Sequence, residues 1–178
     1  MGLNVAVIAG GVFEAEQSLA AANDVMTALK EAEHEPTLFE AAGDLTDTLL
    51  RAQPDVAINC LRGGDGESGD IQDALAAANV PCVGSSAAVC HRAYNKAELA
   101  DALQAYHNLT EDLTTATFAQ SLVFSRRAFE QWGAEAVLSQ VESRISGGYP
   151  LCVKPVSGSA AHGVARVENA EQLADALR

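Results

Sequence analysis

The feature that most constrains this fold is an apolar run of strand length that ends in two glycines and leads into a helical pattern. The run covers residues 3–9 (LNVAVIA), Gly10 and Gly11 follow it, and apolar side chains recur at helical spacing over 15–32. Strand-like runs return at 35–40, 54–61 and 80–84, and helical patterns at 44–52, 70–79 and 85–93. Apolar strands that alternate with helices predict a parallel sheet with helices on both faces. We therefore expect an α/β, Rossmann-like unit with four parallel strands, in which residues 62–69 form a loop.

The second part of the chain has a different pattern. Asn95 is expected to cap a helix that runs to about residue 107, and the polar segment 109–115 is interpreted as a hinge. Beyond it the sequence predicts a strand at 117–124, a helix at 126–145, strands at 150–154 and 163–167, and a helix capped by Asn169. The last two strands flank a loop of small residues and are expected to form a hairpin. The predicted units are therefore 1–94 and 95–178, and the second is a partial α+β unit.

Composition and charge narrow the classes of function. The chain has 178 residues, 48% of them hydrophobic, so it can bury a core. Its net charge of −13 repels nucleic acid and anionic membranes, and we expect neither as a partner. No apolar run reaches the roughly 18 residues of a membrane span, and the N-terminus lacks a signal-peptide pattern, which favours a cytoplasmic protein. The four cysteines are scattered without a C-x-x-C pair, which favours free thiols over a disulfide or a zinc site.

One segment combines a strand, a lysine and a loop of small residues. In YPLCVKPVSGSAAHGV, Lys154 ends the strand and a loop of serine, glycine and alanine follows. A cation and backbone amides that meet in this way suit a phosphate group, although a lysine at a strand end can also simply extend into solvent. Only three lysines occur beside eight arginines, which favours a functional role for this one. A dinucleotide-binding G-x-G-x-x-G turn is disfavoured, because Val12 stands where its second glycine is required.

Four sequence blocks together resemble one enzyme family. They are VAVIAGG with the following Glu14, CLRGGDGESGDIQDAL, NVPCVGSSAAVCHRAYNK, and YPLCVKPVSGSAAHGV. In this order and spacing they are similar to the N-terminal half of the D-alanine:D-alanine ligases, which are members of the ATP-grasp superfamily. The resemblance covers the whole chain. It implies a pre-ATP-grasp domain over 1–94 and the start of the ATP-grasp central subdomain over 95–178.

The resemblance also implies roles for individual residues. Glu14 matches the acidic residue that holds the amino group of the first D-alanine, although the helix dipole also favours an acidic side chain in a first helical turn. Lys96 and Lys154 match the lysines that contact the nucleotide. The loop that covers the phosphates contributes Ser157, Ser159 and Gly163. ATP with Mg²⁺ is the implied cofactor, and its metal ligands are expected in a C-terminal half outside this sequence, so we predict no metal site here.

Some residues depart from the family pattern. Arg62 stands in place of a histidine and Ser68 in place of an aspartate, and Ala160 and Ala161 occupy the positions of two serines. The change at Arg62 and the alanines of the loop favour, as an alternative, an ATP-grasp ligase for another amino acid or a peptide.

The function that the resemblance implies is ATP-dependent ligation in the synthesis of peptidoglycan precursors for the cell wall. A carboxylate is activated as an acyl phosphate, and an amine then attacks it. Because the metal-binding half lies outside this sequence, we expect the chain by itself to be inactive: a fragment, one half of a split enzyme, or a non-catalytic binding or dimerisation module. The expected partners are ATP, D-alanine or a similar amino acid, and a second copy of the chain in a homodimer.

Overall fold

A computed structural model of the chain describes residues 2–41, 44–109 and 119–177. Contacts between residues divide the chain into two compact units, Met1–Tyr94 and Asn95–Arg178. Within the described ranges, no helix combines the length and the apolar character that crossing a membrane requires.

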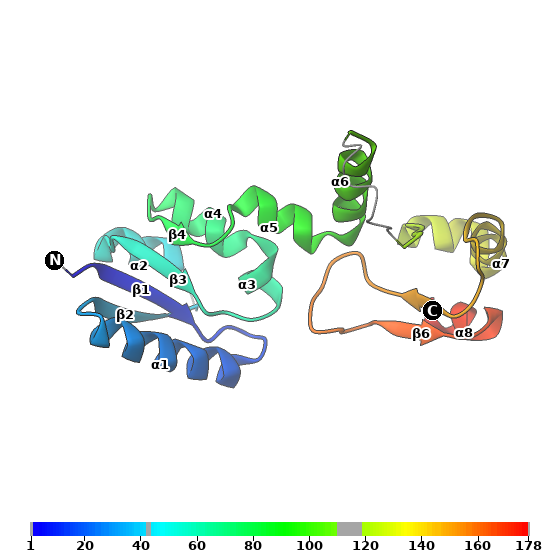
Figure 1. Cartoon of the computed structure of the whole chain (residues 1–178). Coiled ribbons are helices and arrows are strands. Elements are labelled where there is room, and N and C mark those ends of the chain that lie inside the picture. The colour runs from blue at the N-terminus through cyan, green and yellow to red at the C-terminus, as the bar shows by residue number, and fades with distance from the viewer. Residues whose placement is uncertain (1, 42–43, 110–118, 178) are drawn as a thin grey trace. The chain divides into compact units, whose positions relative to one another are not determined.

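The first unit is built on a parallel sheet (Figure 1). Its strands are β1 (Asn4–Ala9), β2 (Glu35–Glu40), β3 (Val56–Asn59) and β4 (Cys82–Val83), in the spatial order β2-β1-β3-β4. Every pairing between neighbouring strands in this order is parallel, so the predicted sheet is confirmed. The chain runs from β1 outward to β2 and then returns past β1 to β3. At such a reversal the carboxyl ends of the two inner strands border a crevice where α/β proteins bind ligands.

Helices cover both faces of this sheet, as the alternation predicted (Figure 1). The helices that pack on it are α1 (Ala15–Glu31) on one face and α2 (Leu45–Ala52) and α4 (Asp70–Ala77) on the other. The unit also contains α3 (Gly64–Ser68) and α5 (Ala87–Tyr94). Successive side chains of a strand point to opposite faces. Accordingly Val7 packs in the core beneath α1, whereas Ile8 packs with Leu49 of α2 and Leu75 of α4 on the other face.

Ser18 is a fully buried polar side chain at the centre of this unit. Its Oγ donates a hydrogen bond to the carbonyl oxygen of Cys60 at 2.9 Å and accepts one from the backbone N–H of Gly10 at 3.0 Å. One hydroxyl therefore joins α1 to the segments that leave β1 and β3.

The edge strand β2 contains a proline. Pro36 stands opposite Val5 of β1 in the parallel register, and among the described strands β1 is the single neighbour of β2 in the sheet order. A proline has no N–H to donate, and edge strands are the place in a sheet where this is tolerated.

The predicted loop at 62–69 contains the short helix α3. The Glu67 side chain accepts a hydrogen bond from the backbone N–H of Gly63 at 2.9 Å, and Asn59 Nδ2 donates to the carbonyl of Gly66 at 2.8 Å. A Cβ added to Gly66 would lie 2.5 Å from Leu61 Cβ, so only glycine fits against this side chain. A turn of five residues that includes two glycines has too little apolar periodicity to predict a helix.

The second unit consists of helices and a β-hairpin. Its elements are α6 (Lys96–Leu109), α7 (Arg126–Arg144), β5 (Leu151–Val153), β6 (Ala165–Val167) and α8 (Ala170–Ala176). β5 and β6 pair in antiparallel fashion, which confirms the predicted hairpin. The two predicted caps form as well, because Asn95 Oδ1 accepts from the N–H of Glu98 and Asn169 Oδ1 accepts from the N–H of Gln172.

Two sequence predictions for this unit are corrected. The strand predicted at 117–124 is absent from its described part, 119–124. Leu122 and Phe124 pack against the core of the unit, so their apolar alternation reflects burial on one side without a partner strand. The helix predicted at 126–145 is interrupted at Gly133, whose φ of 76° is not helical. Apart from Leu109, the predicted hinge at 109–115 lies outside the described residues.

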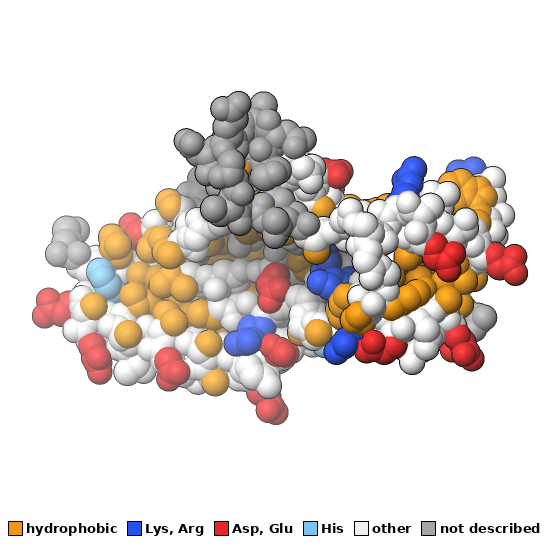
Figure 2. All heavy atoms as spheres, turned by 45° about the vertical axis from the view of Figure 1, so that its right-hand side comes forward, with side chains coloured by type: hydrophobic (Ala, Val, Ile, Leu, Met, Phe, Trp, Pro, Cys, Tyr) orange, Lys and Arg blue, Asp and Glu red, His pale blue; other side chains and the backbone are white. Residues whose placement is uncertain are grey.

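Charged and apolar side chains are intermixed on the surface. On the face that Figure 2 shows, acidic side chains are scattered among hydrophobic ones and do not gather into one cluster. Val12 and Phe13, in the loop after β1, are among the exposed apolar side chains. Exposed apolar groups in a loop at the carboxyl end of a strand are available to line a binding site.

Candidate functional site

Glu14 and Arg62 meet where the loops after β1 and β3 approach each other. Arg62 Nε donates to Glu14 Oε2 at 2.8 Å, and the two side chains are 53% and 40% exposed, respectively. Glu14 precedes α1 as its N-cap residue and has a left-handed backbone, with φ 46° and ψ 43°. A residue with a side chain adopts this conformation at a cost of roughly 1–2 kcal/mol. The backbone thus departs from its preferred conformation at the residue whose carboxylate meets Arg62.

A pocket of about 180 Å³ lies beside this ion pair. Arg62 and Asp65 are its charged lining residues, and the rest of the lining is apolar or glycine: Gly11, Val12, Phe13, Ala41, Leu45, Leu61, Gly63, Gly66 and Ile71. The pocket is therefore small and largely apolar, with a cation at its wall.

In the second unit, Lys96 contacts the loop between β5 and β6. Its Nζ donates to the carbonyl of Gly158 at 2.8 Å, and its backbone N–H donates to the carbonyl of Val156 at 2.8 Å. The start of α6 is thereby joined to the loop that carries Ser157 and Ser159. Two parts of the predicted nucleotide site, Lys96 and the small-residue loop, are thus neighbours.

Lys154 follows β5 and its side chain is exposed. Within the described part of the chain, no hydrogen bond or ion pair holds its ammonium group. At Gly163 the φ angle is 69°, and a Cβ there would lie 2.8 Å from Pro155 Cγ, so the loop requires glycine at this position. Ala160 and Ala161 also have positive φ angles, of 51° and 57°. With Gly158, whose φ angle is 135°, the loop therefore contains four residues with positive φ before β6.

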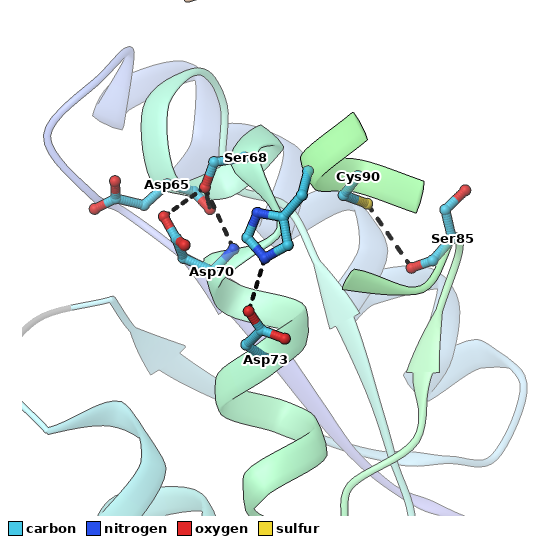
Figure 3. A network of polar contacts seen from close by, with 7 residues as sticks. Asp65, Ser68, Asp70, Asp73, Ser85 and Cys90 are labelled. Atoms are coloured by element: carbon cyan, nitrogen blue, oxygen red, sulfur yellow. Dashed lines mark hydrogen bonds and ion pairs between the residues drawn. The ribbon is translucent and has the colours of Figure 1, made fainter. Parts of the chain in front are cut away.

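A polar cluster that the sequence did not predict lies between α4 and α5 (Figure 3). His91 Nε2 lies 2.7 Å from Asp73 Oδ2, and Ser68 Oγ lies 2.6 Å from Asp70 Oδ2. One ligand-type atom from each of Asp70, Asp73 and His91 lies within 4.8 Å of the others. The hydrogen bond to Asp73 raises the pKa of His91, burial opposes this, and the charges of Asp73 and Asp70 add to it. Because all three side chains are exposed and already paired, the cluster is explained as a link between two helices.

The candidate residues therefore fall into separate local groups. Glu14 is paired with Arg62 in the first unit, and Lys96 contacts the loop in the second unit. From the sequence, Arg62 is interpreted only as the residue that stands in place of the family's histidine. Its contact with Glu14, which lies 48 residues away in the chain, is not predicted. The signal that could have revealed it is that both residues follow adjacent parallel strands.

Comparison with known proteins identifies relatives along almost the whole chain. No protein-family model matches the chain. The D-alanine–D-alanine ligase of Nitratidesulfovibrio vulgaris is 34% identical over 98% of the chain, and that of Pseudomonas fluorescens is 31% identical over 98% of it. The chain covers 52% and 48% of these two proteins, so it spans about half the length of its curated relatives.

Solved structures of such ligases share the fold. The VanG D-Ala:D-Ser ligase from Enterococcus faecalis matches with a TM-score of 0.74 and 20% identity, covering 99% of this chain and 59% of that one. The D-alanine–D-alanine ligase from Bacillus anthracis, solved in complex with ATP, matches with a TM-score of 0.68 and 23% identity, covering 99% of this chain and 54% of that one. The solved structures show a shared fold, and the curated relatives show that the chain is similar to D-alanine–D-alanine ligases along nearly its whole length and corresponds to about half of such a ligase.

Proposed function

We propose that the chain supplies the amino-acid-binding loops and part of the nucleotide-binding unit of an ATP-dependent ligase of the D-alanine–D-alanine type. The observation that carries this proposal is the 31–34% identity to such ligases over 98% of the chain. In the proposed reaction, a carboxylate oxygen of one amino acid attacks the γ-phosphorus of ATP and releases ADP. The amine of a second amino acid then attacks the acyl phosphate and displaces phosphate. The product would serve the synthesis of peptidoglycan precursors.

The chemistry of the second unit fits the phosphates of ATP. Lys96 and Lys154 supply cations, Ser157 and Ser159 supply hydroxyl groups, and Gly163 lets the loop turn sharply. The ammonium of Lys96 already binds an oxygen, the carbonyl of Gly158, which a phosphate oxygen would replace. Charge-assisted hydrogen bonds of this kind stabilise a bound phosphate more than neutral ones do.

In the described part of the second unit, no group of three metal-ligating side chains is present. Among the residues that the structure describes, the one group of three metal-ligating side chains is Asp70, Asp73 and His91 of the first unit. The proposal therefore assigns no magnesium ligand to this chain.

A ligase for an amino acid other than D-alanine is the second candidate, and the Arg62–Glu14 ion pair favours it. Glu14 is the residue that the family resemblance assigns to the substrate's ammonium group, yet its carboxylate already binds a guanidinium at 2.8 Å. A substrate that carries a second anionic group besides its α-carboxylate would place that group on Arg62, and D-alanine has no such group.

Titration with ATP, followed by the backbone amide signals of the protein in NMR spectra, tests the nucleotide site. We expect a Kd no tighter than millimolar, because the chain spans only half of its relatives and a partial site forms few charge-assisted contacts. The amides of Gly158 and Gly163 should shift, and the Lys96→Ala and Lys154→Ala variants should lose this response.

The third lysine provides a matched control. Lys30 lies in the last turn of α1 in the first unit, and Lys30→Ala should leave the response to ATP unchanged. If ATP shifts no amide of the β5–β6 loop, or if all three lysine variants behave alike, the proposed nucleotide site is wrong.

A further inference from the structure

We propose that Arg62 is a receptor for the carboxylate of a small aliphatic amino acid, and that Glu14 positions the guanidinium instead of holding an ammonium group. The inference rests on the proposed function only in taking the ligand to be an amino acid. All of its evidence lies in the first unit.

The ion pair leaves most of the guanidinium available. Arg62 contacts Glu14 through Nε, the nitrogen nearest the aliphatic stem, and its side chain is 53% exposed. The described part of the chain contains no further hydrogen bond from this guanidinium. An arginine has five N–H donors in a planar fork. The terminal nitrogens of Arg62 can therefore form the two parallel hydrogen bonds by which arginine holds a carboxylate.

Glu14 is in a different situation, because one oxygen of its carboxylate already accepts a hydrogen bond. Glu14 Oε2 accepts from Arg62 Nε at 2.8 Å, so an ammonium ligand would share this carboxylate with a guanidinium. Glu14 also does not line the neighbouring pocket, whereas Arg62 does. The effect of Glu14 on a ligand in this pocket is therefore exerted through the position of Arg62.

The pocket beside Arg62 sets the size and polarity of the ligand. Its volume of about 180 Å³ is below the roughly 300–1,000 Å³ that drug-sized ligands occupy. Phe13, Leu45 and Ile71 are among the apolar side chains that line it, and Asp65 is its second charged residue. A short alkyl group fits this lining, with a carboxylate on Arg62 and an ammonium group near Asp65. These are the groups of a small aliphatic amino acid.

The position of the pocket in the fold supports a binding role. Its lining comes from the segments that follow β1, β2 and β3, at the carboxyl edge of the parallel sheet. Parallel α/β sheets bind their ligands at this edge, next to the point where the strand order reverses.

Two simple ligands test whether Glu14 positions Arg62 or holds the ammonium group of the ligand. Propionate carries a carboxylate and a short alkyl group, whereas ethylamine carries an ammonium group and a short alkyl group. In NMR titrations we expect propionate and D-alanine to shift the amide signals of Gly63 and Gly66, and ethylamine to leave them in place. Shifts with ethylamine and none with propionate would overturn the proposal. Inorganic phosphate that binds as tightly as propionate would also overturn it, because an apolar pocket would then contribute nothing.

Variants of Arg62 test the receptor itself. Arg62→Gln should weaken propionate binding by about tenfold or more, because a charge-assisted pair is lost. Arg62→Lys should be intermediate, since it keeps the charge without the fork. Arg51 is an exposed arginine on α2, and Arg51→Gln should leave binding unchanged. An equal loss in the Arg51 and Arg62 variants would show that only the overall charge of the protein matters.

Variants of Glu14 test its role as a positioning residue. Glu14→Gln retains an oxygen that accepts from Arg62 Nε and removes a competing negative charge, so propionate binding should be kept or become tighter. Glu14→Ala removes the contact and should weaken propionate binding. If Glu14→Gln instead abolishes D-alanine binding, the carboxylate holds the ammonium group and the inference fails.

The same samples separate this inference from the proposed function. ATP is detected at the amides of the β5–β6 loop in the second unit, and small carboxylates are detected at Gly63 and Gly66 in the first. Failure of propionate binding with intact ATP binding overturns the role of Arg62 alone. Failure of ATP binding with intact propionate binding overturns the nucleotide site and leaves the carboxylate receptor standing.

Discussion

Ser18 lies in the core of the first unit, where its hydroxyl forms both a donor and an acceptor hydrogen bond. A buried serine with two partners differs from an exposed one, because its removal leaves backbone groups without partners in a place that water does not reach. The sequence pattern marks position 18 only as part of a helix. What makes it important is that Gly10 and Cys60 come together there, and this depends on the tertiary structure.

We expect Ser18→Ala to lower the free energy of unfolding by about 1–3 kcal/mol, since the carbonyl of Cys60 and the N–H of Gly10 would lose their partner. Thr27→Ala is a matched control, because this exposed hydroxyl on the same helix bonds only to the carbonyl of Asn23. Its effect should stay within about 0.5 kcal/mol. Urea denaturation of both variants measures the difference, and equal losses would show that Ser18 is not a special position.

In the candidate site, too, single residues can be selected from the sequence, but the contacts between them cannot. Glu14, Lys96 and Lys154 could be selected from the sequence because the blocks around them resemble a known family. The pairing of Glu14 with Arg62 could not, because it depends on where two side chains of adjacent loops point. Their assigned roles stay predictions until ligands are bound.

At the scale of elements, the first unit was predicted well because its central strand β1 is buried almost throughout, whereas the edge strand β2 is mostly exposed. A buried strand of this kind reads as a continuous apolar run and is hard to mistake. The strand predicted at 117–124 failed in its described part because apolar alternation reports burial on one side and does not reveal whether a neighbouring strand is present. The helix α3 was missed because it is held by the side chains of Glu67 and Asn59 and not by an apolar face.

The contact between α4 and α5 should depend on pH. The pKa of His91 is raised, chiefly by its hydrogen bond to Asp73. The protonated histidine therefore stabilises the folded state fully below the unfolded pKa of about 6.5, and this contribution disappears as the pH rises through the higher folded pKa. We expect the midpoint of thermal unfolding to fall across this window in the wild type and to fall less in His91→Gln.

Asp73→Asn provides the control for this pH effect. It removes the charge that His91 faces, so it should flatten the same part of the pH profile. Because the pair is exposed, the difference should be small and sensitive to salt. A profile that is identical in the wild type and in both variants would show that the His91–Asp73 pair does not form in solution.

At the scale of the whole molecule, activity is expected to need more than this chain. The relatives are about twice as long, and among the described residues the second unit contains no group of three metal-ligating side chains. Phosphoryl transfer depends on neutralising the oxygens of the transferring group. We therefore expect no release of phosphate from ATP with magnesium and D-alanine above the background of a Lys154→Ala control. Turnover clearly above that background would mean that the chain builds a complete site by itself.

Association into a homodimer stays a prediction.

The proline in β2 has a consequence for how this protein behaves at high concentration. An edge strand displays unpaired backbone groups that can recruit a strand from another molecule and so begin aggregation. Pro36 has no N–H and so interrupts the row of backbone hydrogen-bond donors along β2. The strand begins and ends with the charged residues Glu35 and Glu40. Together they make this edge a poor template for a further strand, so the sheet ends there instead of growing from one molecule into the next.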